Sequence, residues 1–182
     1  MAASSSPHDP GPTAARAGSK VSLRLTGPQD LPLLAHWFAD PDFVARWGGR
    51  PLARTTIERD YIGMRLERLP DGREERVWCF LIERGDQPIG YIQCWSDRSG
   101  EGGLDLVLAP EFQGRGFGAD AIRAMVRYAR EVLGWRRVTV DPAADNARAI
   151  RTFEKCGFVF ERDWPDHPDG PSILMVFENP QR

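Results

Sequence analysis

Cysteine and lysine are scarce in this sequence of 182 residues, and it has no long apolar run. The three cysteines, Cys79, Cys94 and Cys156, lie far apart and form no C-x-x-C pair, which argues against both a zinc site and a disulfide framework. We therefore expect no bound metal and a reducing, cytoplasmic location. Lys20 and Lys155 are the only lysines beside many arginines, a bias typical of a GC-rich bacterial genome.

A membrane span needs about 18 consecutive apolar residues, and no segment approaches that length. Residues 1–19 are rich in Ala, Ser, Pro and Gly and contain no apolar core of a signal peptide, so we expect a disordered tail there. The net charge of -2, from 24 basic and 26 acidic residues, offers no basic field for nucleic acid. We expect neither a membrane nor a nucleic acid as a partner, and the oligomeric state stays open between monomer and homodimer.

Residues 20–182 are enough for one domain with a sizeable core and too few for two. The periodicity of the apolar residues predicts the order β-α-α-α-β-β-β-α-β-α-β-β, which indicates an α/β (α+β) fold. Strands are expected at residues 21–26, 77–83, 89–95, 104–108, 138–140, 158–162 and 173–177. Helices are expected over residues 31–40, 42–47 and 55–66, over a long segment that ends at Gly134, and from Asp145 or Asn146 through Lys155.

Residues 113–118 read Gln-Gly-Arg-Gly-Phe-Gly and lie between a predicted strand and the start of the long helix. Their glycines let the backbone approach a ligand closely, and free amides at a helix start attract a phosphate, with Arg115 as an added charge. NAD is a weak interpretation because strands in hairpin order precede the loop, and ATP is weaker because the P-loop Gly-Lys-Ser/Thr is absent. The alternative is a glycine-rich turn that only joins a strand to a helix.

The loop resembles a signature of the GNAT superfamily of N-acetyltransferases, Gln/Arg-x-x-Gly-x-Gly/Ala, through Gln113, Gly116 and Gly118. A second motif of that superfamily, Asn-x-x-Ala-x-x-x-Tyr/Phe-Glu-Lys-x-Gly-Phe, is matched over residues 146–158. The resemblance covers residues 21–178 and implies an N-acetyltransferase that uses acetyl-CoA. It implies a central mixed, mostly antiparallel seven-stranded sheet that is flanked by helices and splayed between its fourth and fifth strands. The residues that it places at the cofactor are Leu106, Val107, Leu108, Gln113, Gly114, Arg115, Gly116, Phe117, Gly118, Asn146, Ala149 and Phe153.

Within that superfamily, the chain resembles aminoglycoside 6'-N-acetyltransferases most closely. The matching segments are spread along the domain and comprise Trp47-Gly48-Gly49, Pro88 to Gln93, Asp141-Pro142, Asn146 to Phe158 and Asp169-Gly170-Pro171. The resemblance implies a cationic amine substrate, an aminoglycoside, whose pocket should present carboxylates and aromatic faces. The residues expected to contact this substrate are Trp47, Tyr91, Gln93, Trp95, Asp97, Asp105, Asp141 and Asp169.

Asp105 and Asp141 are the candidates for catalysis: the resemblance to the aminoglycoside enzymes implies substrate binding and possible work as a base for Asp141, and the same site for Asp105. Asp105 lies on a predicted strand among apolar neighbours, and Asp141 ends the next strand, where a carboxylate can orient an ammonium group and accept its proton. The structural alternatives are that Asp105 points to solvent on an alternating strand and that Asp141 starts a turn with the following proline. The acidic loop of Asp163, Asp166 and Asp169 is equally consistent with substrate binding and with a solvated surface.

Phe153 departs from the family pattern. Many members have a tyrosine at this position, which is proposed to return a proton to the departing thiolate, and phenylalanine cannot do so. The general acid is left unassigned. The histidines, His8, His36 and His167, form no pair that suggests a metal site.

The resemblance implies a direct attack of the neutral amine on the thioester, with a backbone amide near Val107 polarising the carbonyl oxygen. Two alternatives stay open. The acceptor can be a siderophore precursor, a lysine-like metabolite, a polyamine or a protein N-terminus. The chain can also be a non-catalytic module that binds acyl-CoA.

Overall fold

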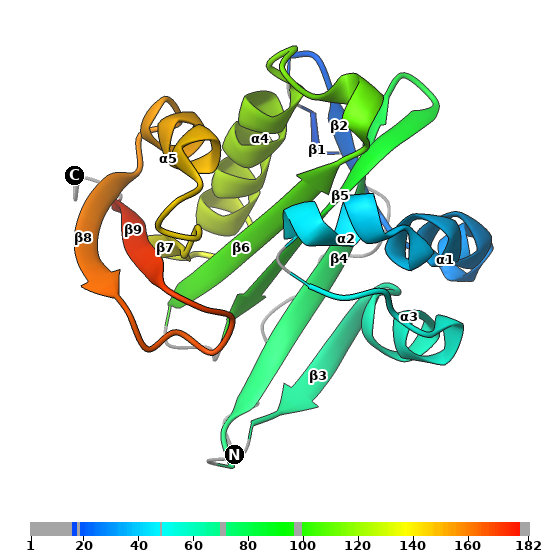
Figure 1. Cartoon of the computed structure of the whole chain (residues 1–182), viewed down its shortest axis with the longest axis horizontal. Coiled ribbons are helices and arrows are strands. Elements are labelled where there is room, and N and C mark those ends of the chain that lie inside the picture. Colours follow the sequence, from blue (N-terminus) through cyan, green and yellow to red (C-terminus); the bar gives the residue numbers. More distant parts are fainter. Residues whose placement is uncertain (1–15, 18, 48, 70–71, 97–99, 179–182) are drawn as a thin grey trace, which may run out of the picture.

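A computed structural model describes residues 16–17, 19–47, 49–69, 72–96 and 100–178 (Figure 1). In these residues a nine-stranded sheet has the order β1-β2-β4-β5-β6-β7-β9-β8, and β3 pairs with β4 outside that path. The strands are β1 (Arg16–Ala17), β2 (Ser22–Leu25), β3 (Met64–Arg68), β4 (Glu74–Arg84), β5 (Gln87–Ser96), β6 (Glu101–Leu108), β7 (Arg137–Val140), β8 (Val159–Trp164) and β9 (Ser172–Glu178). The α-helices are α1 (Leu31–Ala39), α2 (Pro41–Trp47), α3 (Arg54–Asp60), α4 (Phe117–Glu131) and α5 (Ala147–Glu154).

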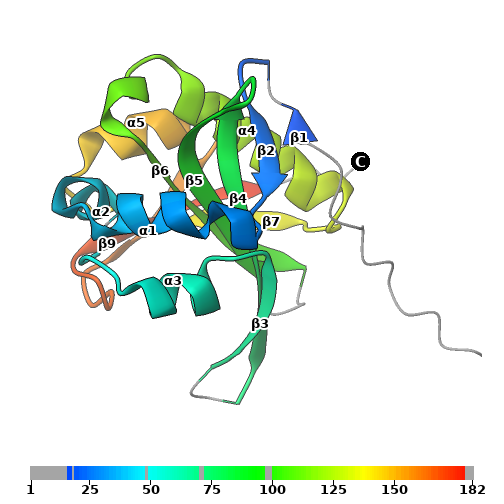
Figure 2. The ribbon, with the colours of Figure 1, turned by 90° about the vertical axis from the view of Figure 1, so that its right-hand side faces the viewer.

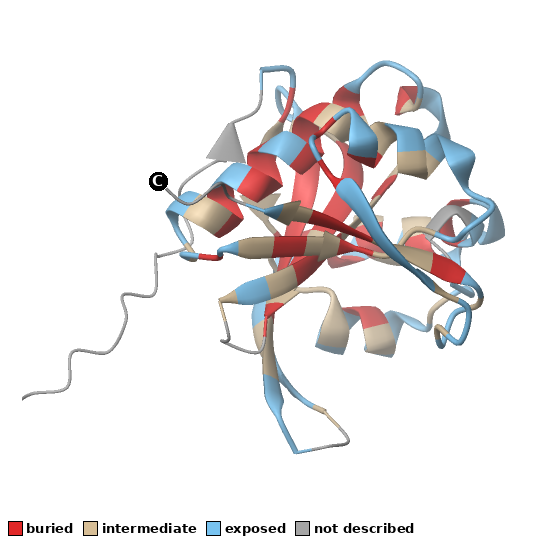
Figure 3. Ribbon diagram, turned by 90° about the vertical axis from the view of Figure 1, so that its left-hand side faces the viewer, coloured by how far each residue is buried: buried red, intermediate tan, exposed pale blue. Residues whose placement is uncertain are grey.

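Helices cover both faces of the sheet, with α4 and α5 on one face and α1, α2 and α3 on the other (Figures 1 and 2). The spacing of four residues places Ala121, Met125 and Ala129 on one side of α4, and all three are fully buried against the sheet. Figure 3 shows buried residues along the middle strands and on the inner sides of the helices. Among the described residues, no helix has the length and apolar character needed to cross a bilayer.

The sheet opens between β6 and β7. These strands pair in parallel only where residues 101–103 face residues 137–139. Beyond Gly103, β6 continues beside β5, whereas β7 pairs with β9. The fork requires glycine, because a Cβ on Gly102 would collide with the Trp135 ring. The predicted splay between the fourth and fifth strands is confirmed, and it creates the space for the candidate site.

The ends of the last two helices follow the sequence signals. The side chain of Asn146 accepts a hydrogen bond of 3.1 Å from the N–H of Ala149, so Asn146 is the residue that caps α5. Gly134 and Gly157 follow α4 and α5 with φ values of 73° and 95°, a conformation that disfavours other residues and ends a helix. These local predictions are confirmed.

The sheet has more strands than the seven predicted. β3 spans residues 64–68, where the sequence analysis extends the third helix to Leu66, so that prediction is wrong. The helix α3 ends at Asp60, Gly63 turns the chain with a φ of 68°, and residues 64–68 then pair with residues 74–78 of β4. The edge of β4 thus supplies hydrogen bonds that no local pattern reveals, and Met64 and Leu66 stay exposed.

The sheet also begins earlier than predicted, because β1 lies within the segment for which the sequence predicts a disordered tail. Residues 1–15 and 18 are outside the described residues. Asp120, in the first turn of α4, accepts hydrogen bonds of 2.7 to 3.1 Å from the backbone N–H groups of Ser19, Lys20 and Val21. Burial alone would raise the pKa of Asp120, but these bonds outweigh burial and hold its pKa below the usual value.

Candidate active site

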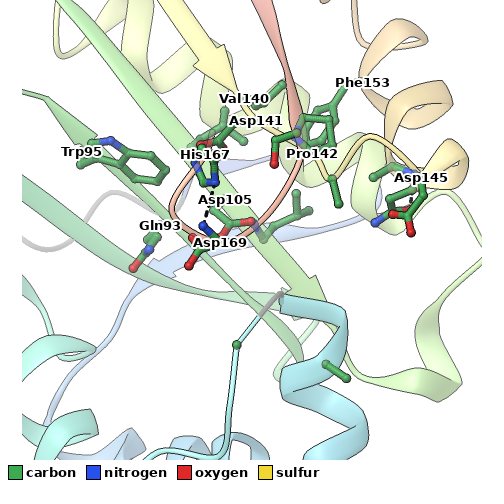
Figure 4. Close-up of a pocket in the computed structure, with 18 residues that line it drawn as sticks. Gln93, Trp95, Asp105, Val140, Asp141, Pro142, Asp145, Phe153, His167 and Asp169 are labelled. Carbon is green, nitrogen blue, oxygen red and sulfur yellow. Dashed lines mark hydrogen bonds and ion pairs between the residues drawn. The ribbon is translucent and has the colours of Figure 1, made fainter. Parts of the chain in front are cut away.

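A cavity of about 660 Å³ lies at the opening between β6 and β7, next to the loop between β8 and β9. Four aspartates line it, Asp105, Asp141, Asp145 and Asp169, and we call it the acidic cavity. Other lining residues are Gln93, Trp95, Phe153 and His167. Figure 4 shows Asp105, Asp141, His167 and Asp169 gathered together, with Gln93 and Trp95 to one side. So many carboxyl groups around one space favour a cationic ligand.

The acidic cavity is assembled from segments that are far apart in the sequence. Asp105 lies on β6 beyond the fork, Asp141 directly follows β7, and Asp169 lies in the β8–β9 loop. Backbone hydrogen bonds of 3.0 Å join residues 142–144 to residues 171–173. These bonds hold the β8–β9 loop against the end of β7 and so place Asp141 and Asp169 at the same cavity.

Asp105 faces the cavity and not bulk solvent. Its side chain is half-buried, and its Oδ1 accepts a hydrogen bond of 2.8 Å from the N–H of Leu106. Burial raises the pKa of Asp105 to about 8; the charge of Asp141 adds to this effect, the Leu106 bond opposes it, and Asp169 adds a smaller rise. A carboxyl group with a pKa near neutral pH is suited to exchanging a proton with a substrate.

Asp141 is paired with His167, whose Nε2 lies 3.0 Å from the Asp141 Oδ2 (Figure 4). The imidazole also accepts a hydrogen bond of 3.2 Å at Nδ1 from the N–H of Asp169, and the Trp164 ring meets it edge-on. Sequence reasoning missed His167 because it weighed histidines only as metal ligands. Its position two residues before Asp169, inside the acidic loop, is the signal that could have indicated it.

Among the residues that the structure describes, no group of three or more His, Cys, Asp or Glu side chains has the arrangement of a metal site. The predicted acidic loop is shorter than expected, because Asp163 lies on β8 and pairs with Ile173 of β9. Asp163 and Asp166 are exposed and do not line the acidic cavity.

A second space of about 260 Å³ lies between β6 and α5, and we call it the β6–α5 groove. Most of the residues predicted to contact the cofactor line it, namely Leu106, Val107, Leu108, Gln113, Gly118, Asn146, Ala149 and Phe153. Leu106, Asn146, Ala149 and Phe153 also line the acidic cavity, so the two spaces meet at these side chains. A ligand in the groove would thus reach the acidic cavity with one end.

The loop before α4 has free amides beside this groove. Gly114 and Gly116 have φ values of 74° and 81°, which only glycine adopts readily, and they turn the chain sharply into α4. The first hydrogen bond of α4 runs from the N–H of Asp120 to the carbonyl of Gly116. The N–H groups of residues 117–119 therefore have no partner within the helix, an arrangement that suits a phosphate.

Other predicted cofactor residues have partners that restrict how they can act. Gln113 donates to the Leu108 carbonyl and accepts from Arg148 at 2.8 Å, so it links the end of β6 to α5. The oxygen of Asn146 caps α5, which leaves its NH₂ group as the donor. Phe117 has a buried ring and can offer a ligand only its backbone, and Arg115 is exposed. Gly114, Arg115, Gly116 and Phe117 do not line the β6–α5 groove.

The predicted substrate residues are only partly brought together. Gln93 and Trp95 line the acidic cavity, as do the predicted aspartates Asp105, Asp141 and Asp169. Tyr91 is fully buried beneath α1, and its hydroxyl donates to the Oε1 of Gln93 at 3.1 Å. Its predicted contact with substrate is therefore not supported. Tyr91 instead positions the side chain of Gln93 through this hydrogen bond. The side chain of Trp47 and all of Asp97 lie outside the described residues.

The model of one protein family, the acetyltransferase (GNAT) domain, matches residues 20–159. The chain belongs to the GNAT family of acetyltransferases. Acetyl-CoA is the acyl donor of these enzymes, and solved structures of relatives contain coenzyme A or acetyl-CoA. The resemblance found in the sequence is thereby confirmed at the level of the family and its cofactor.

Several GNAT enzymes are similar to this chain over most of its length. The aminoglycoside N(6')-acetyltransferase type 1 of Klebsiella pneumoniae is 31% identical over 176 residues, which cover 88% of this chain and 84% of that protein. The spermidine N(1)-acetyltransferase of Vibrio cholerae serotype O1 is 34% identical over 149 residues, with coverages of 79% and 81%. A solved structure of AAC(6')-Ib with ribostamycin and coenzyme A superimposes with a TM-score of 0.73 at 26% identity, covering 88% of this chain and 94% of that one.

The residues of this GNAT chain fit acetyl-CoA, which supplies an acetyl thioester when bound. The loop glycines at positive φ leave open space at Gly114 and free amides at the start of α4, as a pyrophosphate requires. The β6–α5 groove leads from that region to the acidic cavity, and its lining combines apolar side chains with the polar side chains of Gln113, Asn146, Arg148 and Thr152. The β6–α5 groove and the acidic cavity therefore meet at Phe153 and its neighbours.

Proposed function

We propose that the protein is an aminoglycoside 6'-N-acetyltransferase, which transfers an acetyl group from acetyl-CoA to a primary amine of the antibiotic in the cytoplasm. The observation that carries this proposal is the acidic cavity itself, where four aspartates and Trp95 surround a space that meets the β6–α5 groove. The similarity to aminoglycoside N(6')-acetyltransferase type 1 supports the same acceptor.

Asp141, Asp145 and Asp169 would hold the cationic acceptor. An aminoglycoside carries several ammonium groups on linked rings, and carboxylates from separate segments can each pair with one of them. Trp95 lines the same cavity and offers an aromatic face for a sugar ring, with Gln93 as a hydrogen-bonding neighbour. The volume of about 660 Å³ is large enough for part of such a ligand.

Asp105 would move the proton. The ammonium group must lose a proton before its nitrogen can attack, and a carboxylate whose pKa is about 8 accepts a proton readily near neutral pH. As the new C–N bond forms and the C–S bond breaks, Asp105 returns this first proton to the leaving sulfur, and the nitrogen releases its second proton to water as it becomes an amide. Phe153 lines both spaces, but its side chain has no proton that it can donate. We therefore assign both the removal of the proton from the ammonium group and its return to the sulfur to Asp105.

A polyamine is the second candidate acceptor. The spermidine N(1)-acetyltransferase of Vibrio cholerae is 34% identical to this chain, and a row of carboxyl groups also suits a linear polycation. The siderophore precursor, lysine-like metabolite and protein N-terminus have no comparable observation in their favour. Trp95 favours the aminoglycoside, because an aromatic face adds contact area for a ring and little for a flexible chain.

A thiol-release assay with acetyl-CoA tests the proposal on kanamycin, tobramycin and spermidine in parallel. We expect kcat/KM for the aminoglycosides to exceed that for spermidine by at least about tenfold, or about 1.4 kcal/mol of transition-state binding. NMR of the product should locate the acetyl group on the 6' amine. Preference for spermidine, or acetylation at another amine, would overturn the proposal in its present form.

A further inference from the structure

His167 lines the acidic cavity, yet no family motif and no step of the proposed reaction uses it. Building on the proposed function, we propose that His167 is a positioning residue that fixes the carboxylate of Asp141 through one hydrogen bond. The other oxygen of Asp141 is then held ready for an ammonium group of the acceptor. Three observations carry this inference: the tautomer of the ring, the way it is anchored, and the place of Asp141 beside Asp105.

The hydrogen bonds of the imidazole determine its tautomer. The backbone N–H of Asp169 can only donate, so the Nδ1 that it meets at 3.2 Å must accept and carries no proton. The proton of the neutral ring is therefore on Nε2, which lies 3.0 Å from the Oδ2 of Asp141. An N–H that points at a carboxylate makes a charge-assisted hydrogen bond, the stronger kind.

The ring is anchored on several sides and cannot easily turn away from Asp141. Only 12% of its side-chain surface is exposed, and the Trp164 ring packs against it with centroids 4.6 Å apart. Backbone hydrogen bonds join His167 to Trp164 on one side and to Gly170 on the other, so the loop is folded around the histidine. A residue held in this way is a rigid support for a neighbouring group.

A fixed Asp141 matters for both binding and proton transfer. A carboxylate that is already oriented loses less conformational freedom when it meets an ammonium group, so the acceptor binds more tightly. The charge of Asp141 also helps to raise the pKa of Asp105, which otherwise faces Asp169 and the N–H of Leu106. If His167 released Asp141, the acceptor would bind more weakly and Asp105 would titrate at lower pH.

Two substitutions separate this role from simple packing. His167→Phe keeps a ring against Trp164 but removes the N–H, whereas His167→Gln loses the ring and can still donate from its amide to Asp141. We expect His167→Phe to raise the KM for tobramycin about tenfold and to leave the KM for acetyl-CoA within about twofold, the effect of one lost bond to a charged group. His167→Gln should stay within about threefold of the wild type.

The dependence of kcat on pH gives a readout that packing alone would not move. We expect the midpoint that belongs to Asp105 to fall in His167→Phe and to stay near its wild-type value in His167→Gln. Asp166→Asn is the matched control, because Asp166 is in the same loop, is exposed and does not line the acidic cavity. Equal behaviour of the Phe and Gln variants, or a wild-type KM in His167→Phe, would overturn the inference.

A measurement on the unmodified chain covers the case in which a variant does not fold. Long-range proton–nitrogen NMR correlations distinguish the imidazole tautomers, and the His167 signals are those that remain when His8 and His36 are each replaced by Gln. We expect a proton on Nε2 and none on Nδ1 at pH 7.5; the opposite tautomer would contradict the inference. Failure to acetylate any aminoglycoside would instead contradict the proposed function and leave the pairing of His167 and Asp141 intact.

Discussion

Asp105 and Asp141 repel each other across the acidic cavity, and this repulsion adds to burial in raising the pKa of Asp105 to about 8. The strands β6 and β7 pair over only three residues and then separate, and both carboxyl groups line the space that this separation leaves. Neighbouring acids in different surroundings can take different parts in a reaction, one exchanging protons and the other holding charge. The geometry is therefore consistent with proton exchange by Asp105 and charge binding by Asp141, two roles that the sequence alone did not divide between them.

Asp105→Asn should reduce kcat by about 10²- to 10⁴-fold, the usual contribution of a positioned proton acceptor. The variant keeps an oxygen for the Leu106 N–H, so the local backbone should be unchanged. In the wild type, kcat should rise with pH and level off above about 8, since only the ionised form of Asp105 accepts a proton. Steady-state rates with saturating tobramycin from pH 6 to 9.5 check both expectations. A variant with the wild-type rate would remove Asp105 from the mechanism.

Asp105→Asn should also be more stable than the wild type at alkaline pH. The pKa of Asp105 is raised in the fold from 3.8 to about 8, so its favourable contribution is complete below pH 3.8 and is lost as pH rises through 8. Asparagine does not ionise and pays no such penalty. The difference in Tm between variant and wild type should therefore be larger at pH 9 than at pH 5. A difference that does not change with pH would contradict the raised pKa.

Asp141→Asn should weaken acceptor binding more than it slows chemistry. The substitution removes the charge that faces the ammonium group but keeps an oxygen that can accept from His167. We expect the KM for kanamycin to rise by about tenfold or more, with a smaller fall in kcat. Asp163→Asn, which removes a charge from the exposed part of the β8–β9 region, is the control. Equal kinetics for Asp141→Asn and the wild type would exclude Asp141 from the acceptor site.

Gly116→Ala should impair acetyl-CoA binding specifically. Gly116 has a φ of 81°, where a Cβ costs about 1 kcal/mol, and relaxing that strain would move the amides at the start of α4. We expect a higher KM for acetyl-CoA with an unchanged KM for the aminoglycoside. Gly72→Ala is the matched control, because Gly72 has a φ of 86° with open space around it in the β3–β4 hairpin. Similar kinetics in the two variants would argue against a phosphate at this loop.

Asp120→Asn should destabilise the fold by about 2 kcal/mol at pH 7, because a charged acceptor of several hydrogen bonds is replaced by a neutral one. The pKa of Asp120 is lowered in the fold, so its contribution is present above the usual value of 3.8 and is lost as pH falls through its folded pKa. The gap between the urea unfolding free energies should thus shrink in acid. Identical urea midpoints at pH 7 would show that the Asp120 contacts contribute nothing.

Local signals were enough for the parts of the site that depend on neighbours in the chain. The glycines before α4, the Asn146 cap of α5 and the apolar stripe of α4 involve residues within a few positions of each other. Their conformations follow from steric limits and hydrogen bonds within one turn, and the residue types at neighbouring positions are enough to predict them. The same segments carry the family motifs, so the sequence could indicate acetyl-CoA as the cofactor before the fold was known.

Only the tertiary structure decided how distant residues act on one another. The sequence placed Asp105 and Asp141 in one site without dividing their roles, and the fold makes Asp105, Asp141 and Asp169 one electrostatic system. Tyr91 fitted the substrate pattern but is covered by α1, while His167 fitted none and meets Asp141. Burial and long-range pairing depend on which strands lie side by side. The order of the strands is determined by the whole chain, and no single segment reveals it.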